Sequence, residues 1–337
     1  MATSPMSEAP GASGDQPVVT VVLPMHNAED VIAKTIHSVL NQTFQDFEII
    51  LCDDGSTDDT VARAVAAVEE RSDPVAWSLL RLKGRGAAGA RNDGIEVARG
   101  EFIAFLDDDD CWAPQKLEVS LGTLRDLEVD MVCHAEQWAD DGPGGATHVR
   151  LYRHLFDDRL DPLISLFRNN PFSTSAIVVR RDRLVQAGLF DEEIPSAEDY
   201  DLWIRLVAIS DLRFGFEDSV LGTYLVRSGG ESGKVDRRYE ALLCIGERYS
   251  TLLVERFGPK RAWFELWIYR ARVEFTTGVR LVRQGRVRFG LRMAMLGWCR
   301  WPFRFDWVRF WLKNRKSFQT GHRHSALMDH CDETGIT

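Results

Sequence analysis

The first third of the chain alternates between short apolar runs and longer amphipathic segments. The apolar runs are typical of buried strands, because nearly every position in them is hydrophobic. They lie at residues 18–25, 47–52, 75–82 and 101–106. Strands that alternate with helices at this spacing predict a parallel sheet with right-handed crossovers and helices on both faces. We therefore expect an α/β fold.

The segments between these runs predict the helices. We expect Asn27 to cap the first helix, since asparagine is favoured at that position. Four apolar residues then recur at helical spacing and share one face: Ile32, Ile36, Val39 and Leu40. A second helix is predicted over about residues 58–70. Residues 83–92 (KGRGAAGARN) predict a flexible glycine-rich loop that leads into a short helix.

Beyond Pro114, which suits the first turn of a helix, the pattern becomes mixed. Two segments predict strands and one predicts a helix, respectively 130–138, 174–181 and 197–209. From about residue 236 helices dominate. Their predicted stops are Gly258-Pro259 and Gly285.

Composition indicates a globular protein of a reducing compartment. With 337 residues, 45% of them hydrophobic, the chain can bury one large core or two modest ones. Its six cysteines show no C-x-x-C spacing, which argues against a disulfide framework or a zinc site. No secretory signal begins the chain, and no apolar stretch approaches the roughly 18 residues of a membrane span. We expect a cytoplasmic protein.

Charge is distributed unevenly along the chain. The formal net charge is −10, yet residues 260–316 hold 15 lysines and arginines against three acidic residues. Six of the ten tryptophans lie there too. The stretch 286–316 has three interpretations: a helical subdomain packed on the core, a segment on an anionic membrane surface, or a nucleic-acid patch. Nothing else in the chain supports nucleic-acid binding, and the first two interpretations are compatible.

Four consecutive aspartates, Asp107 to Asp110, directly follow the apolar run 101–106. Adjacent carboxylates repel one another, so this arrangement suits open solvent or a bound cation. Residues two apart in an extended turn can face the same way, so Asp107 and Asp109 could share one Mg²⁺ or Mn²⁺, with phosphates as further ligands. The alternative is an acidic turn that caps the helix near Pro114, which explains one or two of the four.

Two more polar segments follow predicted strands, at the sheet edge where ligands bind in open α/β folds. Pro24 and Asn27 follow or end the first strand, and Asp53 and Asp54 follow the second. A carboxylate accepts the imide N–H of uracil or thymine strongly, so the aspartate pair suits a nucleotide base. A plain strand-to-helix turn is the alternative. Arg91 either reaches a diphosphate or remains a solvated surface residue.

Three segments, in order, resemble the family 2 glycosyltransferases. They are VVTVVLPMHNAEDVIAKTIHSVLNQTFQDFEIILCDDGSTDDT (18–60), GARNDGIEVARGEFIAFLDDDDCW (89–112) and SAEDYDLWIRL (196–206). The resemblance spans roughly residues 18–227 and is specific, because three separate motifs occur in the right order. It implies an inverting, nucleotide-sugar-dependent enzyme with the GT-A fold, a Rossmann-like and mostly parallel sheet with helices on both faces.

The resemblance also implies roles for single residues. Asp53 and Asp54 match the segment that contacts the base, and Pro24 and Asn27 line the same pocket. Together with Arg91, they are the predicted donor-binding residues of the first half of the site.

The D-x-D signature of the family falls on Asp107-Asp108-Asp109. The resemblance implies that Asp107 and Asp109 hold the metal, and that Asp107 and Asp108 contact the donor. Asp199 matches the general base, and Glu198 is expected to orient rather than react. The Q-x-x-R-W motif of processive members is absent, which favours addition of a single sugar.

The sequence thus predicts an enzyme that moves one sugar from a nucleotide-sugar, UDP- or dTDP-linked rather than GDP-linked, to a glycan or lipid-linked glycan of the cell surface. Two alternatives stay open: a catalytically silent protein of the same fold that binds nucleotide-sugar or a partner, and a nucleotidyltransferase. We expect the enzyme in the cytoplasm, or peripherally at the inner face of the plasma membrane. The predicted parts are a disordered tail (1–16), the GT-A domain (17–230), a helical basic and aromatic region (231–318) and a flexible tail (319–337).

Overall fold

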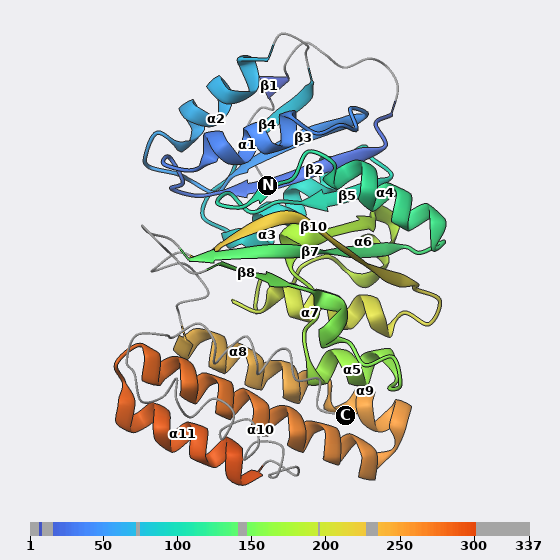
Figure 1. Cartoon of the computed structure of the whole chain (residues 1–337), viewed down its shortest axis with the longest axis vertical. Coiled ribbons are helices and arrows are strands. Elements are labelled where there is room, and N and C mark those ends of the chain that lie inside the picture. The colour runs from blue at the N-terminus through green and yellow to red at the C-terminus, as the bar shows by residue number, and fades with distance from the viewer. Residues whose placement is uncertain are drawn as a thin grey trace. The chain divides into compact units, whose positions relative to one another are not determined.

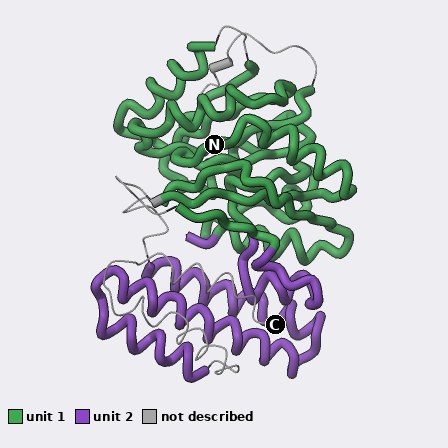
Figure 2. Tube along the Cα trace, in the orientation of Figure 1, with its two compact units in different colours: residues 1–153, 172–193, 198–227 green, residues 154–171, 194–197, 228–337 purple. Residues whose placement is uncertain are grey.

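The computed structural model describes residues 7–8, 16–71, 75–140, 147–194, 196–226 and 235–300. The predicted tail at 319–337, most of that at 1–16, and the second half of the basic stretch 286–316 lie outside these ranges. The chain divides into two compact units, coloured separately in Figure 2. Unit 1 comprises residues 1–153, 172–193 and 198–227, and unit 2 comprises residues 154–171, 194–197 and 228–337.

Unit 1 contains a single ten-stranded mixed sheet (Figure 1). Its order is β1-β4-β3-β2-β5-β9-β7-β10-β6, with β8 paired to β7. The strands are β1 (Ser7–Glu8), β2 (Val19–Met25), β3 (Phe47–Asp53), β4 (Ala76–Arg81), β5 (Phe102–Phe105), β6 (Cys111–Trp112), β7 (Met131–Asp140), β8 (Thr147–Arg150), β9 (Ile177–Arg180) and β10 (Phe214–Val226). Strands β4, β3, β2 and β5 are parallel. Antiparallel pairs flank them, formed by β1 with β4 and by β9 with β5. The expected α/β fold is confirmed, and its later half is mixed.

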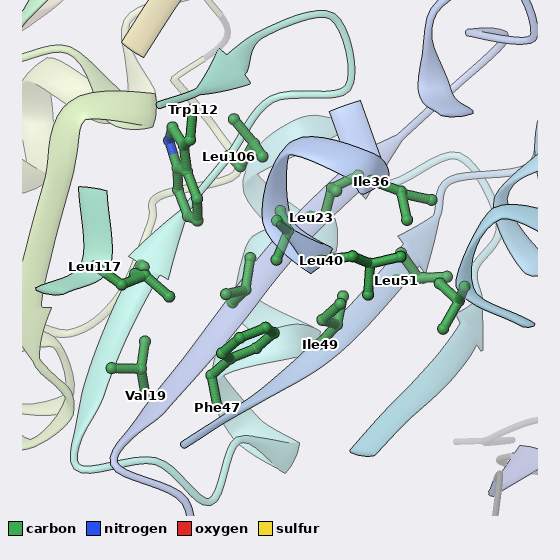
Figure 3. Close-up of a cluster of buried hydrophobic side chains, with 14 of the residues drawn as sticks. Val19, Leu23, Ile36, Leu40, Phe47, Ile49, Leu51, Leu106, Trp112 and Leu117 are labelled. Carbon is green, nitrogen blue, oxygen red and sulfur yellow. The ribbon is translucent and has the colours of Figure 1, made fainter. Parts of the chain in front are cut away.

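Helices cover both faces of the parallel half, as the alternation predicted. The helices of unit 1 are α1 (Ile32–Leu40), α2 (Thr60–Glu69), α3 (Gly86–Val97), α4 (Lys116–Asp126), α6 (Arg181–Ala187) and α7 (Glu198–Ala208), with a 3₁₀ turn at Thr174–Ala176. The last three helices lie beside the mixed half. Figure 3 shows the core on the α1 side, where β2 contributes Val19 and Leu23 and α1 contributes Ile36. On the opposite face α3 approaches so closely that a Cβ on Gly94 would lie 2.6 Å from Val22 Cγ1.

Two local predictions were wrong. Asn27 does not cap α1, which begins at Ile32 after an N-cap at Val31 without a side-chain hydrogen bond. Asn27 instead adopts φ = 50°, a left-handed conformation that asparagine tolerates because its side chain bonds locally. The predicted loop at 83–92 is also largely helical, since α3 starts at Gly86.

Unit 2 is helical over its described residues. Its helices are α5 (Pro162–Arg168), α8 (Val235–Arg248), α9 (Ser250–Phe257), α10 (Pro259–Arg283) and α11 (Val287–Arg300), and a 3₁₀ turn spans Tyr152–Leu155 at the boundary between the units. The stops predicted at Gly258-Pro259 and Gly285 separate α9, α10 and α11. None of the helices that the structure describes is long and apolar enough to cross a bilayer.

Candidate active site

Three of the predicted site segments lie at the carboxyl ends of parallel strands in unit 1. β2 ends at Met25, β3 at Asp53 and β5 at Phe105, and these three strands are neighbours in the sheet. Parallel neighbours end at one edge, so the loops that leave them meet there.

Pro24 lies within β2 although proline cannot donate a backbone hydrogen bond. It is tolerated because β2 pairs with β5 only over Val19–Val22. Beyond Val22 the strand pairs on one side only, with β3, where Pro24 lies opposite Cys52. The break from β5 opens the sheet where the site segments emerge.

The loop after β2 makes hydrogen bonds to the loops that follow β3 and β5. The backbone N–H of His26 donates to Asp108 Oδ2 (2.9 Å), and its ring Nδ1 lies 3.1 Å from the carbonyl oxygen of Asp54. The Asn27 side-chain oxygen accepts a hydrogen bond from the backbone N–H of Thr57 (2.9 Å). The contacts of Asn27 therefore shape the loop that follows the aspartate pair.

Asp53 and Asp54 are both buried but differ in what they bind. Asp54 accepts the backbone N–H groups of Arg85 and Gly86, each at 2.7 Å, with its two oxygens. It thereby satisfies donors at the start of α3, and its charge faces the positive end of the helix. Asp53 accepts the Ser56 N–H with Oδ1 (3.1 Å), while Oδ2 has no hydrogen-bond partner among the described residues. Of the two, Asp53 is the better placed to accept a hydrogen bond from a ligand.

Arg91 is the buried cation of this edge, 5% exposed, so the solvated alternative is excluded. Its Nη2 lies 2.6 Å from Asp107 Oδ1 and its Nη1 lies 3.3 Å from Glu198 Oε1. Its guanidinium carbon lies 5.3 Å from the centre of the Phe190 ring. Burial lowers the pKa of Arg91, but the charges of Asp107 and Glu198 more than offset this, so the pKa is raised. Arg91 joins the D-x-D segment to the start of α7.

The four aspartates after β5 have separate environments. Asp107, Asp108 and Asp109 are half-buried, whereas Asp110 is 1% exposed. Asp110 accepts hydrogen bonds from Ser175 Oγ (2.5 Å) and from the Leu225 backbone N–H (3.0 Å). Burial raises its pKa well above the usual range, and the charge of Glu136 adds to this. Asp110 does not cap a helix, because α4 begins only at Lys116.

Glu198 and Asp199 begin α7. Glu198 is held by Arg91, while Asp199 is half-buried and contributes to the electrostatic environment of that arginine. Burial raises the pKa of Glu198; the charge of Arg91 opposes this, and the charge of Asp199 adds to it. The first turn of the helix thus brings a second pair of carboxylates beside the D-x-D segment.

The donor set suits a hard cation that also binds phosphate. Asp107 and Asp109 are half-buried, and their negative charges add to the burial that raises the pKa of Asp110. A divalent cation would relieve this excess of negative charge. Among the described residues no group of three or more His, Cys, Asp or Glu side chains could hold a metal alone. Mg²⁺-type sites use one or two protein carboxylates together with substrate phosphates.

Some residues of this site gave no signal in the sequence. Ser175 donates to Asp110 and accepts a hydrogen bond from the Asp107 N–H (3.2 Å), but it lies 65 residues from Asp110. Only the antiparallel pairing of β9 with β5 brings its 3₁₀ turn next to the D-x-D segment.

Comparison with known proteins identifies relatives over this unit. The model of the glycosyl transferase family 2 matches residues 20–188. The Escherichia coli protein WfgD, a UDP-Glc:alpha-D-GlcNAc-diphosphoundecaprenol beta-1,3-glucosyltransferase, is 41% identical over 205 residues, which are 60% of this chain and 76% of that protein. The putative teichuronic acid biosynthesis glycosyltransferase TuaG of Bacillus subtilis is 29% identical over 221 residues, 65% of this chain and 83% of TuaG.

A solved structure shares the fold. The mannosyltransferase PcManGT from Pyrobaculum calidifontis, in complex with GDP-Man and Mn²⁺, superimposes with a TM-score of 0.58. The match covers 97% of this chain and 89% of PcManGT at 18% sequence identity.

Proposed function

Because the chain belongs to glycosyl transferase family 2 and is a glycosyltransferase, we propose that it transfers one sugar from a nucleoside diphosphate to a hydroxyl group of a lipid-linked glycan. The observation that carries this proposal is the convergence of three strand ends and the first turn of α7 on one acidic edge built around Arg91. The absence of a Q-x-x-R-W motif supports a single addition.

The donor binds at the ends of β2 and β3, with Asp53 Oδ2 accepting the imide N–H of a uracil or thymine base. Asp54 fixes the loop beneath the base, and Pro24 and Asn27 line the same pocket. WfgD uses a UDP-sugar, which supports UDP as the nucleotide. A guanine base is the less favoured alternative.

A divalent cation, Mg²⁺ or Mn²⁺, would be held by Asp107 and Asp109 and would neutralise charge on the departing diphosphate. The Mn²⁺ complex of PcManGT supports a divalent ion in this fold. Asp108 contacts the donor beside this pair. Arg91 keeps Asp107 in position.

Asp199 acts as the general base. A hydroxyl is a poor nucleophile at neutral pH, so a positioned carboxylate must accept its proton as the new bond forms. The acceptor oxygen bonds to the anomeric carbon, the bond from that carbon to the diphosphate breaks, and the nucleoside diphosphate leaves. Attack opposite the leaving group inverts the configuration. Glu198, held by Arg91, orients this turn of α7.

The test is a panel of UDP-, dTDP- and GDP-sugars with and without Mn²⁺. We expect a UDP- or dTDP-sugar to raise the melting temperature only with the metal present, and to be hydrolysed slowly without an acceptor. Stabilisation without any hydrolysis or transfer would support the catalytically silent alternative. No stabilisation by any nucleotide-sugar would contradict the proposal.

We also propose that residues 286–316, which include α11, contact the cytoplasmic face of the membrane that carries the acceptor lipid. Four of its apolar side chains recur at helical spacing and are 40–61% exposed: Val287, Leu291, Met295 and Trp298. Arg288 and Arg292 are exposed among them. Arginines interleaved with large apolar side chains are typical of helices that lie on anionic bilayers.

The face of α11 that packs on α10 consists largely of small residues, so the large apolar side chains lie on the other face. Glycines bring the helix against α10: a Cβ on Gly290 would lie 2.6 Å from the carbonyl oxygen of Gly278, and one on Gly297 would lie 2.5 Å from that of Ala271. Contact through glycine backbone leaves the large side chains on the exposed face. The remaining residues of the predicted membrane stretch, 301–316, lie outside the described part of the chain.

Vesicle flotation tests this surface. We expect the protein to float with anionic vesicles at low salt and to dissociate at high salt, because each basic residue near such a surface contributes about 1 kcal/mol. Arg288→Glu with Arg292→Glu should abolish flotation. The matched pair Arg63→Glu with Arg125→Glu changes the net charge equally, on exposed residues of unit 1, and should not. Equal flotation with neutral and anionic vesicles would contradict the proposal.

A further inference from the structure

The carboxyl ends of β7 and β10 lie at the same sheet edge as the candidate active site. β5 is antiparallel to β9, and β9 is antiparallel to β7, so β7 runs in the direction of β5. β10 is parallel to β7. The last residues of these two strands therefore point to the edge where Asp107 follows β5.

Three rings form a continuous row at this edge, called here the aromatic ladder: Tyr224 on β10, Trp138 on β7 and His148 on β8. The register pairs Tyr224 with Trp138 and Trp138 with His148. The first two rings stack at 4.4 Å between centroids and 21° between planes. The second and third lie 5.9 Å apart at 41°.

Polar side chains hold the Trp138 ring in position. Trp138 Nε1 donates to the Tyr152 hydroxyl (3.2 Å), and that hydroxyl donates to Glu136, which is 1% exposed. The guanidinium carbon of Arg150 lies 4.6 Å from the centre of the Trp138 ring. The central ring is thus held by a hydrogen bond at its edge and a cation over its face, and needs little ordering when a ligand arrives.

The ladder is joined directly to the D-x-D segment. Register pairs Gly222 with Trp112 and Thr223 with Cys111 in antiparallel strands, which sets Tyr224 beside Asp110. The Leu225 N–H, next to Tyr224 in the chain, donates a hydrogen bond to Asp110 Oδ1. The charge of Asp107 also contributes to the raised pKa of Glu136 beneath the ladder.

The ladder differs from the aromatic residues of the core. Trp203 and Trp112, which pack inside unit 1, are 0% and 5% exposed. Tyr224, Trp138 and His148 are all only half-buried. Ligand sites are lined mainly by hydrophobic and aromatic side chains with a few placed polar groups, and the ladder with its polar neighbours has this composition.

We propose that the aromatic ladder binds the acceptor sugar, with a pyranose ring packed against the half-exposed Tyr224 next to the D-x-D segment, while Trp138 and Arg150 support that ring from behind. The C–H groups of a pyranose face are weakly positive and match the negative face of an aromatic ring. This inference rests on the proposed function for the identity of the ligand as a sugar. It assigns the acceptor to β7, β8 and β10, whereas the donor occupies the ends of β2, β3 and β5.

The experiment uses the full chain and one soluble probe, an N-acetylglucosamine α-diphosphate carrying a short alkyl chain. Saturation-transfer NMR without donor measures binding of the probe, and steady-state kinetics with a UDP-sugar measure KM for probe and donor separately. Tyr224→Ala should raise the KM of the probe about ten-fold, the cost typical of losing one aromatic contact. It should weaken the NMR effect in parallel and leave the donor KM and donor hydrolysis unchanged. Tyr224→Phe, the matched control, keeps the ring and should retain at least half of the binding.

The possible results separate the acceptor-site proposal from the proposed function. Unchanged probe binding and KM in Tyr224→Ala, with a normal melting temperature, would overturn the ladder as the acceptor site. A donor KM that rises as much as the probe KM would overturn it too, because the ring would then serve both substrates. If the wild-type protein binds the probe through Tyr224 but neither transfers nor hydrolyses a sugar, the ladder stands and the proposed function fails.

Discussion

Buried ion pairs occur in both units, but cations are in excess in one and carboxylates in the other. In unit 2, Glu265 is fully buried between Arg168 (2.9 Å) and Arg261 (2.7 Å). In unit 1, Arg91 holds Asp107 and Glu198, while Asp109 and Asp199 add further negative charge nearby. A buried charge is costly unless it is paired, so the two arginines around Glu265 serve the stability of unit 2. The carboxylates around Arg91 instead suit the divalent cation proposed above.

The largest effect is expected from Asp199→Asn, which removes the proposed base without changing the size of the side chain. Turnover should fall by about 10²–10⁴-fold, the usual contribution of a positioned general base. Donor affinity measured by calorimetry should stay within two-fold, roughly. The exposed Asp211→Asn in the same unit serves as the control. A loss of donor affinity equal to the loss of rate would make Asp199 a binding residue.

Asp109→Ala tests whether the excess charge of unit 1 serves a cation. Transfer should fall by about 10²–10³-fold, because charge on the leaving diphosphate is no longer offset. The thermal stabilisation by donor with Mn²⁺ should disappear, while the melting temperature of the free protein stays the same or rises, since a repulsive charge is gone. Asp126→Ala, an exposed acidic residue on α4, is the control. Full activity of Asp109→Ala in the presence of a chelator would contradict the metal site.

Arg168→Met tests whether the buried ion pair with Glu265 stabilises unit 2. Removing one partner of a buried pair costs about 3 kcal/mol of unfolding free energy, because Glu265 keeps its charge with less compensation. Donor hydrolysis per folded molecule should not change. Urea denaturation measures the stability change, and Arg256→Met, which breaks a more exposed pair with Asp161, should cost below about 1 kcal/mol. Equal costs in the two variants would show that burial of Glu265 is unimportant.

The smallest effect concerns Glu136, whose pKa burial raises to about 7. Tyr152, Arg150, Asp107 and Asp110 face it and modulate this value. The folded protein therefore holds the proton more tightly than the unfolded chain, so stability is present below the ordinary carboxyl pKa and is lost as pH rises towards 7. Glu136→Gln lacks this dependence. Relative to the wild type, the variant should gain on the order of 2–3 kcal/mol between pH 4.5 and pH 7.5 in urea titrations. Parallel pH profiles would contradict the buried, protonated carboxyl.

The comparison of the two units also shows how far sequence reasoning reached. The apolar runs before Asp53 and Asp107 predicted parallel strands, and strand direction alone placed both aspartates at one edge. The prediction of a loop over the glycine-rich segment 83–92 was wrong, because glycine usually disfavours a helix. α3 forms there nonetheless, with Asp54 satisfying two N–H groups at its start and Gly94 allowing close contact with β2.

The sequence by itself determined the parallel half of the sheet, the family and the acidic character of the site, since each depends on residues close together in the chain. It could not distinguish Asp110 from Asp107, because four identical side chains in a row have identical local signals. Tertiary structure decided that Asp110 is buried on Ser175 and Leu225, that Arg91 reaches Glu198, and that Tyr224 stacks on Trp138. These contacts join residues separated by 65 or more positions, and only the pairing of distant strands and helices sets which side chains share a face.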